Sequence, residues 1–296
     1  MQRSGILLAM AGAIAFSGKA IIVKLAYRHG VDAATLIMYR MLFALPLFLL
    51  MAWWAETRPQ ARAQPLRRRD WAGIIGLGFM GYYLSSYLDF LGLQYVSAGL
   101  ERLILYLNPT LVLVLGWVMY RRPLPSKRLV AMGVSYSGVL VVFGHEVVWA
   151  GDQVAWGAVL VFMSAVTYAL YLIYSGEIVK RLGSMRLVGW ASTVACLCCI
   201  IQFLLVRPLD AAVVPSPVIW LSMLNAGACT VAPVLLVMMA IERIGPGLTS
   251  QTGMVGPMST LARGVLILDE PLNLWIGAGT LLVLGGVFMV TRLGAK

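Results

Sequence analysis

Residues 97–116, SAGLERLILYLNPTLVLVLG, return in altered form as residues 245–264, GPGLTSQTGMVGPMSTLARG. A shift of 148 positions aligns the two stretches without a gap and places Pro109 on Pro257. Glycines match near both ends of the two stretches and again further along the chain. Because glycine and proline set the conformation of the backbone, matches at these residue types indicate a shared backbone shape. The chain therefore contains an internal repeat.

Both copies of the repeat are almost entirely apolar. Of the 296 residues, 60% are hydrophobic and 12% are charged, whereas about 25% of a soluble domain is charged. A helix crosses a bilayer with about 20 apolar residues, and its backbone groups find all their hydrogen bonds internally. We therefore predict an all-α membrane protein. Its ten predicted transmembrane helices are residues 4–27, 31–54, 71–94, 97–120, 126–144, 153–175, 186–206, 216–240, 247–268 and 272–292.

Five of the predicted helices fall in residues 1–147 and five in residues 148–296. Because five is an odd number, the second half enters the membrane in the opposite direction to the first. We therefore expect two inverted five-helix repeats related by a pseudo-two-fold axis in the membrane plane. Such repeats are typical of transporters that open alternately to the two sides of the membrane.

The net charge of +11 is spread unevenly over the predicted loops. Most of the 23 Lys and Arg residues lie in the loops on the side of both termini, which the positive-inside rule assigns to the cytoplasm. We expect a multi-pass protein of the inner (plasma) membrane with both termini cytoplasmic. Since this charge sits in short loops, no nucleic-acid partner is expected. The expected partners are membrane lipid and a small-molecule substrate.

Four motifs resemble the repeat of the drug/metabolite transporter superfamily in its ten-helix EamA-type branch. In the first half they are residues 92–100 (GLQYVSAGL) and 107–109 (LNP). In the second half they are residues 242–248 (ERIGPGL) and 269–272 (DEPL). Members of this family are mostly exporters of amino acids, metabolites or drugs, so the resemblance implies such an activity and a central cavity between the halves.

The resemblance also implies a Glu before the last helix of each half. Glu270 fits this pattern in the second half, but Arg121 and Arg122 stand at the matching place in the first half. Any role of that Glu is therefore not symmetric in this chain.

Ionisable residues inside predicted spans are costly and usually face a cavity or a partner. We expect Lys19 to face the cavity, and Lys24, Arg40 and Arg102 to extend to the membrane interface. Glu101 and its neighbour Arg102 lie about 100° apart around the helix, which predicts that they do not share a face. Three roles are open for Glu101: a site for a substrate amine, a proton site, and a partner in an outer gate.

The fourth and ninth predicted helices carry matched stripes. Glu101, Leu105 and Asn108 are spaced i, i+4, i+7, and their repeat mates are Thr249, Gly253 and Gly256. A proline follows each stripe and lacks the N–H that would bond the carbonyl four residues earlier, at Leu105 or at Gly253. We predict broken helices around Pro109, Pro257, Gly253 and Gly256, whose freed carbonyls bind a substrate ammonium; a simple packing kink is the alternative.

Aromatic and polar side chains on other helices complete the predicted substrate site. Rings with a few polar tips suit amphiphilic organic solutes, although packing or an interfacial position would also explain any single Tyr. The predicted substrate-binding residues are Lys19, Tyr82, Ser86, Glu101, Leu105, Asn108, Tyr168, Tyr171, Asn225, Thr249 and Thr252.

The sequence shows no signature of an enzyme. It has no phosphate-binding glycine-rich loop and no nucleophile–base pairing, and its four Cys lie inside predicted spans without a carboxylate or His beside them. We expect no catalytic residues, no metal and no cofactor.

We therefore predict a secondary transporter that exports amino acids or related small organic metabolites by alternating access. The coupling is open, with proton coupling as one possibility, and so is the oligomeric state. A nucleotide-sugar or drug carrier of the same fold is an alternative, and a membrane-embedded enzyme or a nonselective channel is an alternative of another class.

Overall fold

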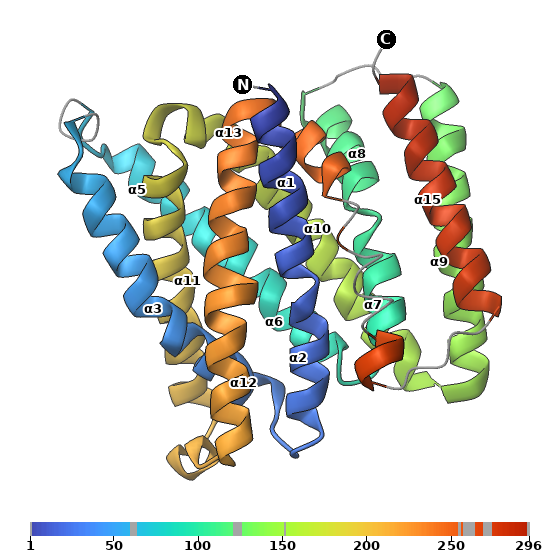
Figure 1. The fold of residues 1–296 in the computed structure, drawn as a ribbon, viewed down its shortest axis with the longest axis horizontal. Helices are drawn as coiled ribbons and strands as arrows, with labels where there is room; N and C mark the ends of the chain where they lie inside the picture. The colour runs from blue at the N-terminus through green and yellow to red at the C-terminus, as the bar shows by residue number, and fades with distance from the viewer. Residues whose placement is uncertain are drawn as a thin grey trace.

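The computed structural model describes residues 2–59, 64–120, 126–150, 152–253, 256, 264–268 and 274–294. These residues are almost entirely helical, and no strand occurs among them (Figure 1). The fold class predicted from the sequence is confirmed. The helices of the first half are α1 (Gln2–Phe16), α2 (Gly18–Tyr27), α3 (Ala33–Thr57), α5 (Arg68–Leu77), η1 (Gly78–Leu84), α6 (Ser85–Gly92), α7 (Ala98–Leu105), α8 (Asn108–Tyr120) and α9 (Ser126–Ala150). Those of the second half are α10 (Asp152–Leu182), α11 (Ser184–Val206), η2 (Leu209–Ala212), α12 (Ser216–Ala226), η3 (Gly227–Val231), α13 (Ala232–Thr252) and α15 (Leu274–Gly294).

Within the described ranges, helical segments lie on all ten predicted spans, and several spans consist of two or three segments. Six stretches of the described residues are long and apolar enough to cross a membrane by length and composition. Large apolar side chains such as Trp53, Leu205 and Trp220 are exposed on the outside, where lipid would cover them. The eighth and ninth spans meet at Gly245, whose φ of 79° breaks α13 close to the predicted start of the ninth span at residue 247.

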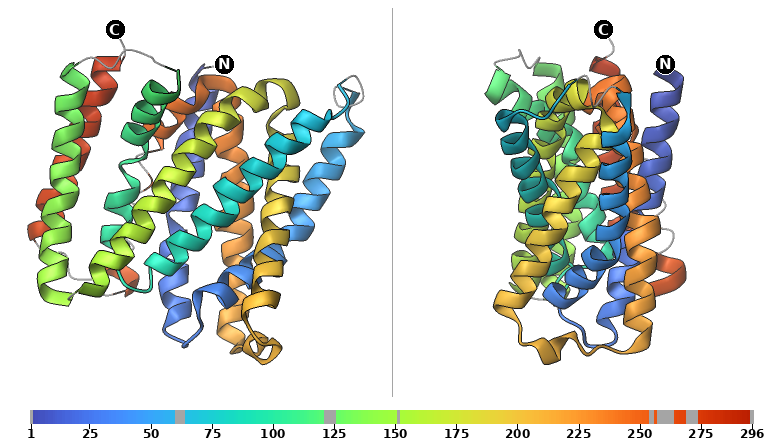
Figure 2. Two further views of the ribbon diagram at one scale, coloured as in Figure 1. Left: turned by 180° about the vertical axis from the view of Figure 1, so that it is seen from behind. Right: turned by 90° about the vertical axis from the view of Figure 1, so that its left-hand side faces the viewer.

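Helices at equivalent places in the two halves run in opposite directions. In Figure 1, α1 and α2 descend from the N-terminus, whereas α10 ascends. The chain ends on the side from which it started, so both termini lie at one end of the bundle (Figure 2). Helices α3 and α11 pack together toward one edge and α9 and α15 at the other, with α1 against α13 between them (Figures 1 and 2).

Glycines allow the closest contact between α9 and α15. A Cβ added at Gly138 would lie 2.6 Å from the Gly279 carbonyl oxygen and 2.9 Å from a methyl group of Val283. A Cβ added at Gly286 would lie 2.6 Å from the Ala131 carbonyl oxygen. Backbones therefore touch where side chains would otherwise hold the helices apart, as is common between membrane helices.

The third span of each half contains a π-helical segment. The first is η1 (Gly78–Leu84) and the second is η3 (Gly227–Val231), and a shift of 148 positions superimposes residues 79–83 on residues 227–231. In the second segment the Thr230 hydroxyl donates to the carbonyl of Asn225, 2.8 Å away, and so satisfies an acceptor beside the widened turn. Short π-segments are rare and frequently occur at functional sites.

Polar contacts fasten the helix ends outside the apolar layer. On the side of the termini, Arg186 binds Glu56 through two parallel bonds, Nε to Oε1 at 2.7 Å and Nη2 to Oε2 at 2.8 Å. On the opposite side, the Asp32 carboxylate accepts from the backbone N–H groups of Ala34 and Thr35 and so caps α3. Asp32 also pairs with Arg207 at 3.2 Å, which joins the two halves there.

Candidate functional site

A cavity of about 160 Å³ lies between helices of the two halves. Its wall combines aromatic rings, hydroxyl groups and charged side chains. The predicted site residues in this wall are Lys19, Tyr82, Ser86, Leu105, Asn108, Tyr168 and Thr249, together with Pro109 and Gly253. The wall also includes Phe16, Arg40, Ser85, Asp89, Arg102, Tyr106, Ser164 and Thr230.

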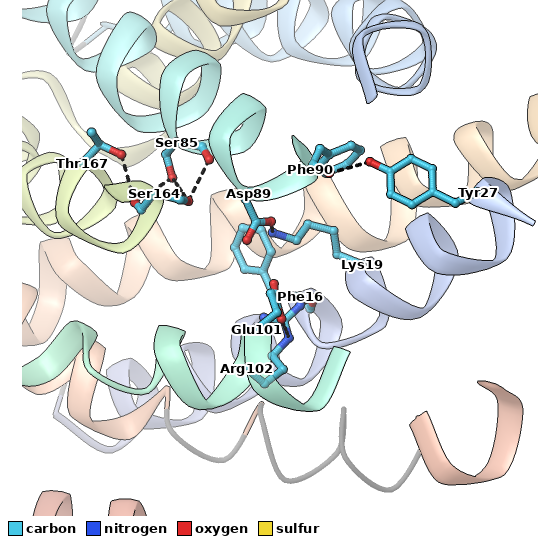
Figure 3. Close-up of polar contacts among 10 residues, drawn as sticks. All are labelled: Phe16, Lys19, Tyr27, Ser85, Asp89, Phe90, Glu101, Arg102, Ser164 and Thr167. Atoms are coloured by element: carbon cyan, nitrogen blue, oxygen red, sulfur yellow. Dashed lines mark hydrogen bonds and ion pairs between the residues drawn. The ribbon is translucent and has the colours of Figure 1, made fainter. Parts of the chain in front are cut away.

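Lys19 forms a buried ion pair with Asp89 in the cavity wall (Figure 3). The break between α1 and α2 lies at Ser17, two residues before Lys19, and Asp89 lies on α6. Lys19 is 9% exposed and Asp89 1% exposed, so water screens the pair little. The two charges therefore satisfy each other at a depth where either one alone would be costly.

Glu101 and Arg102 meet at the start of α7, with Nε of Arg102 2.9 Å from Oε2 of Glu101 (Figure 3). The prediction that adjacent positions keep these side chains apart is wrong, because the long Arg side chain turns back toward its neighbour. The Glu101 carboxyl also interacts with the Asp89 carboxyl and with Lys19. Two acidic and two basic side chains thus form one buried cluster, the charge cluster, made of Lys19, Asp89, Glu101 and Arg102.

Arg102 also bonds the backbone at the end of α1. Its Nη2 donates to the carbonyl oxygen of Phe16, the last residue of α1, over 3.5 Å. The prediction that Arg102 and Arg40 extend to the membrane interface is wrong for both, because they are only 6% and 2% exposed. Both line the cavity.

The fourth span is broken at Tyr106 and Leu107, between α7 and α8, close to Pro109. The Leu105 carbonyl lacks a backbone donor because of the proline, as expected. However, Nδ2 of Asn108 donates to it over 2.9 Å, so this carbonyl is not free to bind a substrate ammonium. The Asn108 side chain therefore has two roles: it bonds the carbonyl at the break, and it forms part of the cavity wall.

The matching region of the second half is described only in part, and Pro257, Arg263 and Glu270 lie outside the described residues. The Gly253 carbonyl accepts from the backbone N–H of Gly256 over 3.1 Å, so it too is occupied. Gly256 packs on the first span, where an added Cβ would lie 2.6 Å from the Ala13 carbonyl oxygen. Thr249 is 3% exposed and donates to the Gly245 carbonyl over 2.7 Å, which leaves its lone pairs for other partners.

Three tyrosines form a layered aromatic group at the cavity. Tyr82 and Tyr168 line it, while Tyr171 lies behind them, with ring centroids 5.0 Å from Tyr82 and 5.7 Å from Tyr168. Gly81 makes room for this packing, because an added Cβ would lie 2.2 Å from the Tyr171 ring. The π-helical segment carries both Gly81 and Tyr82, so it places the glycine against one ring and the tyrosine in the wall.

Two serines join the halves in the wall of the cavity. Oγ of Ser164 on α10 donates to the Ser85 carbonyl over 2.7 Å, and Oγ of Ser85 on α6 donates to the Ser164 carbonyl over 3.2 Å (Figure 3). Sequence reasoning did not single out this pair. No motif marks it, because the two residues are 79 positions apart and neither spacing nor charge distinguishes them from other serines.

Some predicted site residues lie away from the cavity wall. Glu101 is fully buried behind it in the charge cluster, and Asn225 is fully buried in α12. Thr252 donates its hydroxyl to the Leu248 carbonyl over 2.8 Å and is partly exposed. Among the described residues, no group of His, Cys, Asp and Glu side chains is arranged to hold a metal ion.

An all-helical bundle with a solute-sized, charged cavity between oppositely directed halves defines a class of multi-pass membrane transporters. The model of the EamA-like transporter family matches this chain twice, over residues 3–144 and 155–292. The chain belongs to the EamA-like transporter family, and the resemblance inferred from its motifs is confirmed.

Proteins similar to this chain carry names of transporters. The uncharacterized transporter YcbK of Bacillus subtilis (strain 168) is 29% identical over 295 residues, which cover 97% of this chain and 91% of YcbK. An uncharacterized transporter of Archaeoglobus fulgidus is 22% identical over 282 residues, 93% of each chain. A solved structure titled "Crystal structure of protein" shares the fold, with a TM-score of 0.71 over 100% of this chain and 99% of that chain, at 17% identity. The prediction of a transporter rather than an enzyme is confirmed.

Proposed function

We propose that this membrane transporter exports amino acids or related small organic metabolites across the inner (plasma) membrane. The observation that carries the proposal is the cavity, which residues of both halves line with aromatic, hydroxyl and charged groups. Such a wall suits a solute that has an apolar part and an ionic part. The aromatic rings bind the apolar part of the solute. The charge cluster and neighbouring polar groups orient its ionic part.

Alternating access by two inverted repeats is the proposed mechanism. Its support is the opposite course of equivalent helices such as α1 and α10 (Figure 1). On the side away from the termini, Nη2 of Arg28 donates to the Leu268 carbonyl over 2.9 Å and so fastens the first half to the second. That contact and the Asp32–Arg207 pair must separate before the cavity can open on that side. The positive-inside rule makes this side the outer one, with both termini cytoplasmic.

Proton coupling through Glu101 and Asp89 is the proposed source of energy. The two carboxyl groups interact inside the charge cluster, and like charges at such short range oppose simultaneous ionisation. One proton bound between them relieves this repulsion. Its release on one side of the membrane and uptake on the other would link proton movement to the opening of the cavity.

Reconstituted protein tests the transport proposal. Liposomes loaded with a panel of labelled amino acids and related metabolites should lose at least one solute faster than protein-free liposomes, with saturation, and a pH gradient should change the rate. Ser86→Ala and Tyr168→Phe should raise the half-saturating concentration. Trp220→Phe is the matched control, since Trp220 is 67% exposed on the outside of the bundle. No protein-dependent efflux across the panel, or equal effects of cavity and control variants, would refute the assignment.

A further inference from the structure

Arg40 is a buried cation in the cavity wall, and it forms no ion pair with any acidic side chain that the structure describes. It lies on α3, is 2% exposed, and its guanidinium carbon sits 4.5 Å above the centre of the Phe90 ring. Its Nε and Nη2 atoms are buried and have no hydrogen-bond partner within the part of the chain that the structure describes. A buried donor without a hydrogen-bond partner is destabilising, and more so when it is charged.

The neighbours of Arg40 do not supply the missing anion. The groups that act electrostatically on Arg40 are the thiols of Cys196 and Cys199 on α11, the thiol of Cys229 on η3, and the Asp89 carboxyl on α6. Asp89 is already bound by Lys19. The remaining carboxylate of the charge cluster, on Glu101, is paired with Arg102.

The charges at the cavity therefore do not balance. Among the described residues of the wall and the charge cluster, Lys19, Arg40 and Arg102 are basic, and Asp89 and Glu101 are acidic. Asp89 lies in an ion pair with Lys19 and Glu101 in one with Arg102, which leaves Arg40 as the basic residue of this set without an acidic partner. Buried ions in proteins are normally paired, and a cation in a membrane-embedded cavity is a strong indication of an anionic ligand.

A second buried arginine of the same chain has hydrogen-bond partners for its guanidinium group. Arg186 is 5% exposed, and its Nε and Nη2 bind the two oxygens of the Glu56 carboxylate. These are the same two atoms that lack partners in Arg40. A guanidinium edge of this kind matches the spacing of carboxylate oxygens and binds them through two parallel bonds.

We propose that Arg40 binds the carboxylate of the transported solute, and that the substrates of this transporter are therefore carboxylate-bearing amphiphiles and not simple amines. The inference rests on the proposed transport function and narrows its substrate class. A carboxylate offers the two oxygens that this guanidinium edge can bind in parallel, as the Glu56 carboxylate does for Arg186. The rings of Phe16, Tyr82 and Tyr168 in the same wall would take the apolar part of such a solute.

A binding experiment with four matched probes tests this assignment without requiring transport. The probes are L-phenylalanine, 3-phenylpropionate, L-phenylalaninamide and phenethylamine, of which only the first two carry a carboxylate. The readout is the unfolding temperature of the purified full-length protein in detergent, with and without each probe. Both carboxylates should raise it, the amide and the amine should not, and Arg40→Gln should weaken carboxylate binding by about ten- to a hundredfold. Arg40→Lys should recover part of the effect.

The same measurements without probe separate a binding arginine from a structural one. Arg40→Gln should unfold at the wild-type temperature or above, because it removes an uncompensated buried charge. Arg186→Gln, the matched control, should unfold at a lower temperature and retain the response to carboxylates. The inference is overturned if no carboxylate stabilises the wild type, if amine and amide act equally, if sodium chloride alone has the same effect, or if Arg40→Gln behaves like Arg186→Gln.

Transport of the same probes in liposomes distinguishes failure of this inference from failure of the proposed function. Efflux of phenethylamine without binding or efflux of carboxylates would leave the protein a transporter and overturn the role of Arg40. Carboxylate binding that depends on Arg40, without efflux of any solute, would support the inference and contradict the transport proposal.

Discussion

Lys19 of α2 and Asp89 of α6 form an ion pair that joins the first and third spans of the same half at the cavity wall. The pair lies beside Ser17, the residue that separates α1 from α2 in the first span. A change in the charge of either residue therefore acts at once on the shape of the cavity and on the position of α2.

Removal of either partner of this pair should destabilise the protein. Lys19→Met or Asp89→Asn leaves one charge buried without its partner, at a cost of about 3–5 kcal/mol. The double variant should be more stable than the sum of the two single effects predicts. Thermal unfolding of the four proteins in detergent measures this coupling, and strictly additive effects would show that the two charges do not depend on each other.

Glu101→Gln should uncouple transport from the proton gradient. The substitution keeps the shape of the side chain and removes its charge, so exchange of labelled for unlabelled solute should continue while pH-driven accumulation disappears. Loss of both activities would instead make Glu101 a binding group for a substrate amine. Normal affinity with a changed rate of outward opening would make it a latch, and wild-type behaviour in all assays would make it structural.

Pro109→Ala should impair transport more than folding. The new N–H at position 109 can bond the Leu105 carbonyl, which Asn108 now occupies, and so straighten the junction of α7 and α8. Expression and unfolding temperature should remain close to wild type, while the initial rate of efflux falls. Transport at the wild-type rate would mean that the break in the fourth span has no role in the cycle.

Gly138→Ala should destabilise the contact between α9 and α15. The added methyl would lie 2.6 Å from the Gly279 carbonyl oxygen, and overpacking of this kind costs about 1–3 kcal/mol. Gly144→Ala on the same helix is the matched control. Nothing lies within 4 Å of its Cβ position, so the better helix propensity of alanine should leave stability unchanged or improved. Equal unfolding temperatures for the two variants would contradict the close contact.

Cysteine labelling in intact cells should report the orientation of the protein. Single cysteines at His29 and Asp210, in a background without the four native cysteines, should react with an impermeant maleimide added outside. A cysteine at Gln64 should react only after the membrane is permeabilised. External labelling at Gln64 would reverse the proposed topology.

The membrane fold follows from features that a single sequence displays directly. Apolar runs of span length and the match of Pro109 to Pro257 report on the backbone, and neither depends on which helices become neighbours. The break in the fourth span beside Pro109 could be predicted from such local features. Thr249 lines the cavity, whereas its repeat mate Glu101 is buried behind the wall. The repeat pattern alone does not distinguish these two positions.

The details that escaped prediction depend on contacts between distant helices. The position of Arg40 along the second span predicts a side chain that reaches the interface, but its neighbours on α6 and α11 bury it, and it lies over the Phe90 ring. Adjacent helical positions point Glu101 and Arg102 about 100° apart, but the Arg102 side chain is long enough for its guanidinium to reach the Glu101 carboxylate. The π-helical segments have no sequence signature beyond nearby glycines such as Gly81, so periodicity alone could not reveal them.

The contact between α9 and α15 has the symmetry of an interface between two identical subunits. Gly138 meets Gly279 and Val283, and their equivalents 148 positions away, Gly286 on one side and Ala131 and Ser135 on the other, meet in the same way. Such a self-complementary surface is the rule in two-fold dimers, where each favourable contact forms twice. This edge of the bundle is therefore assembled like a dimer whose two copies share one chain.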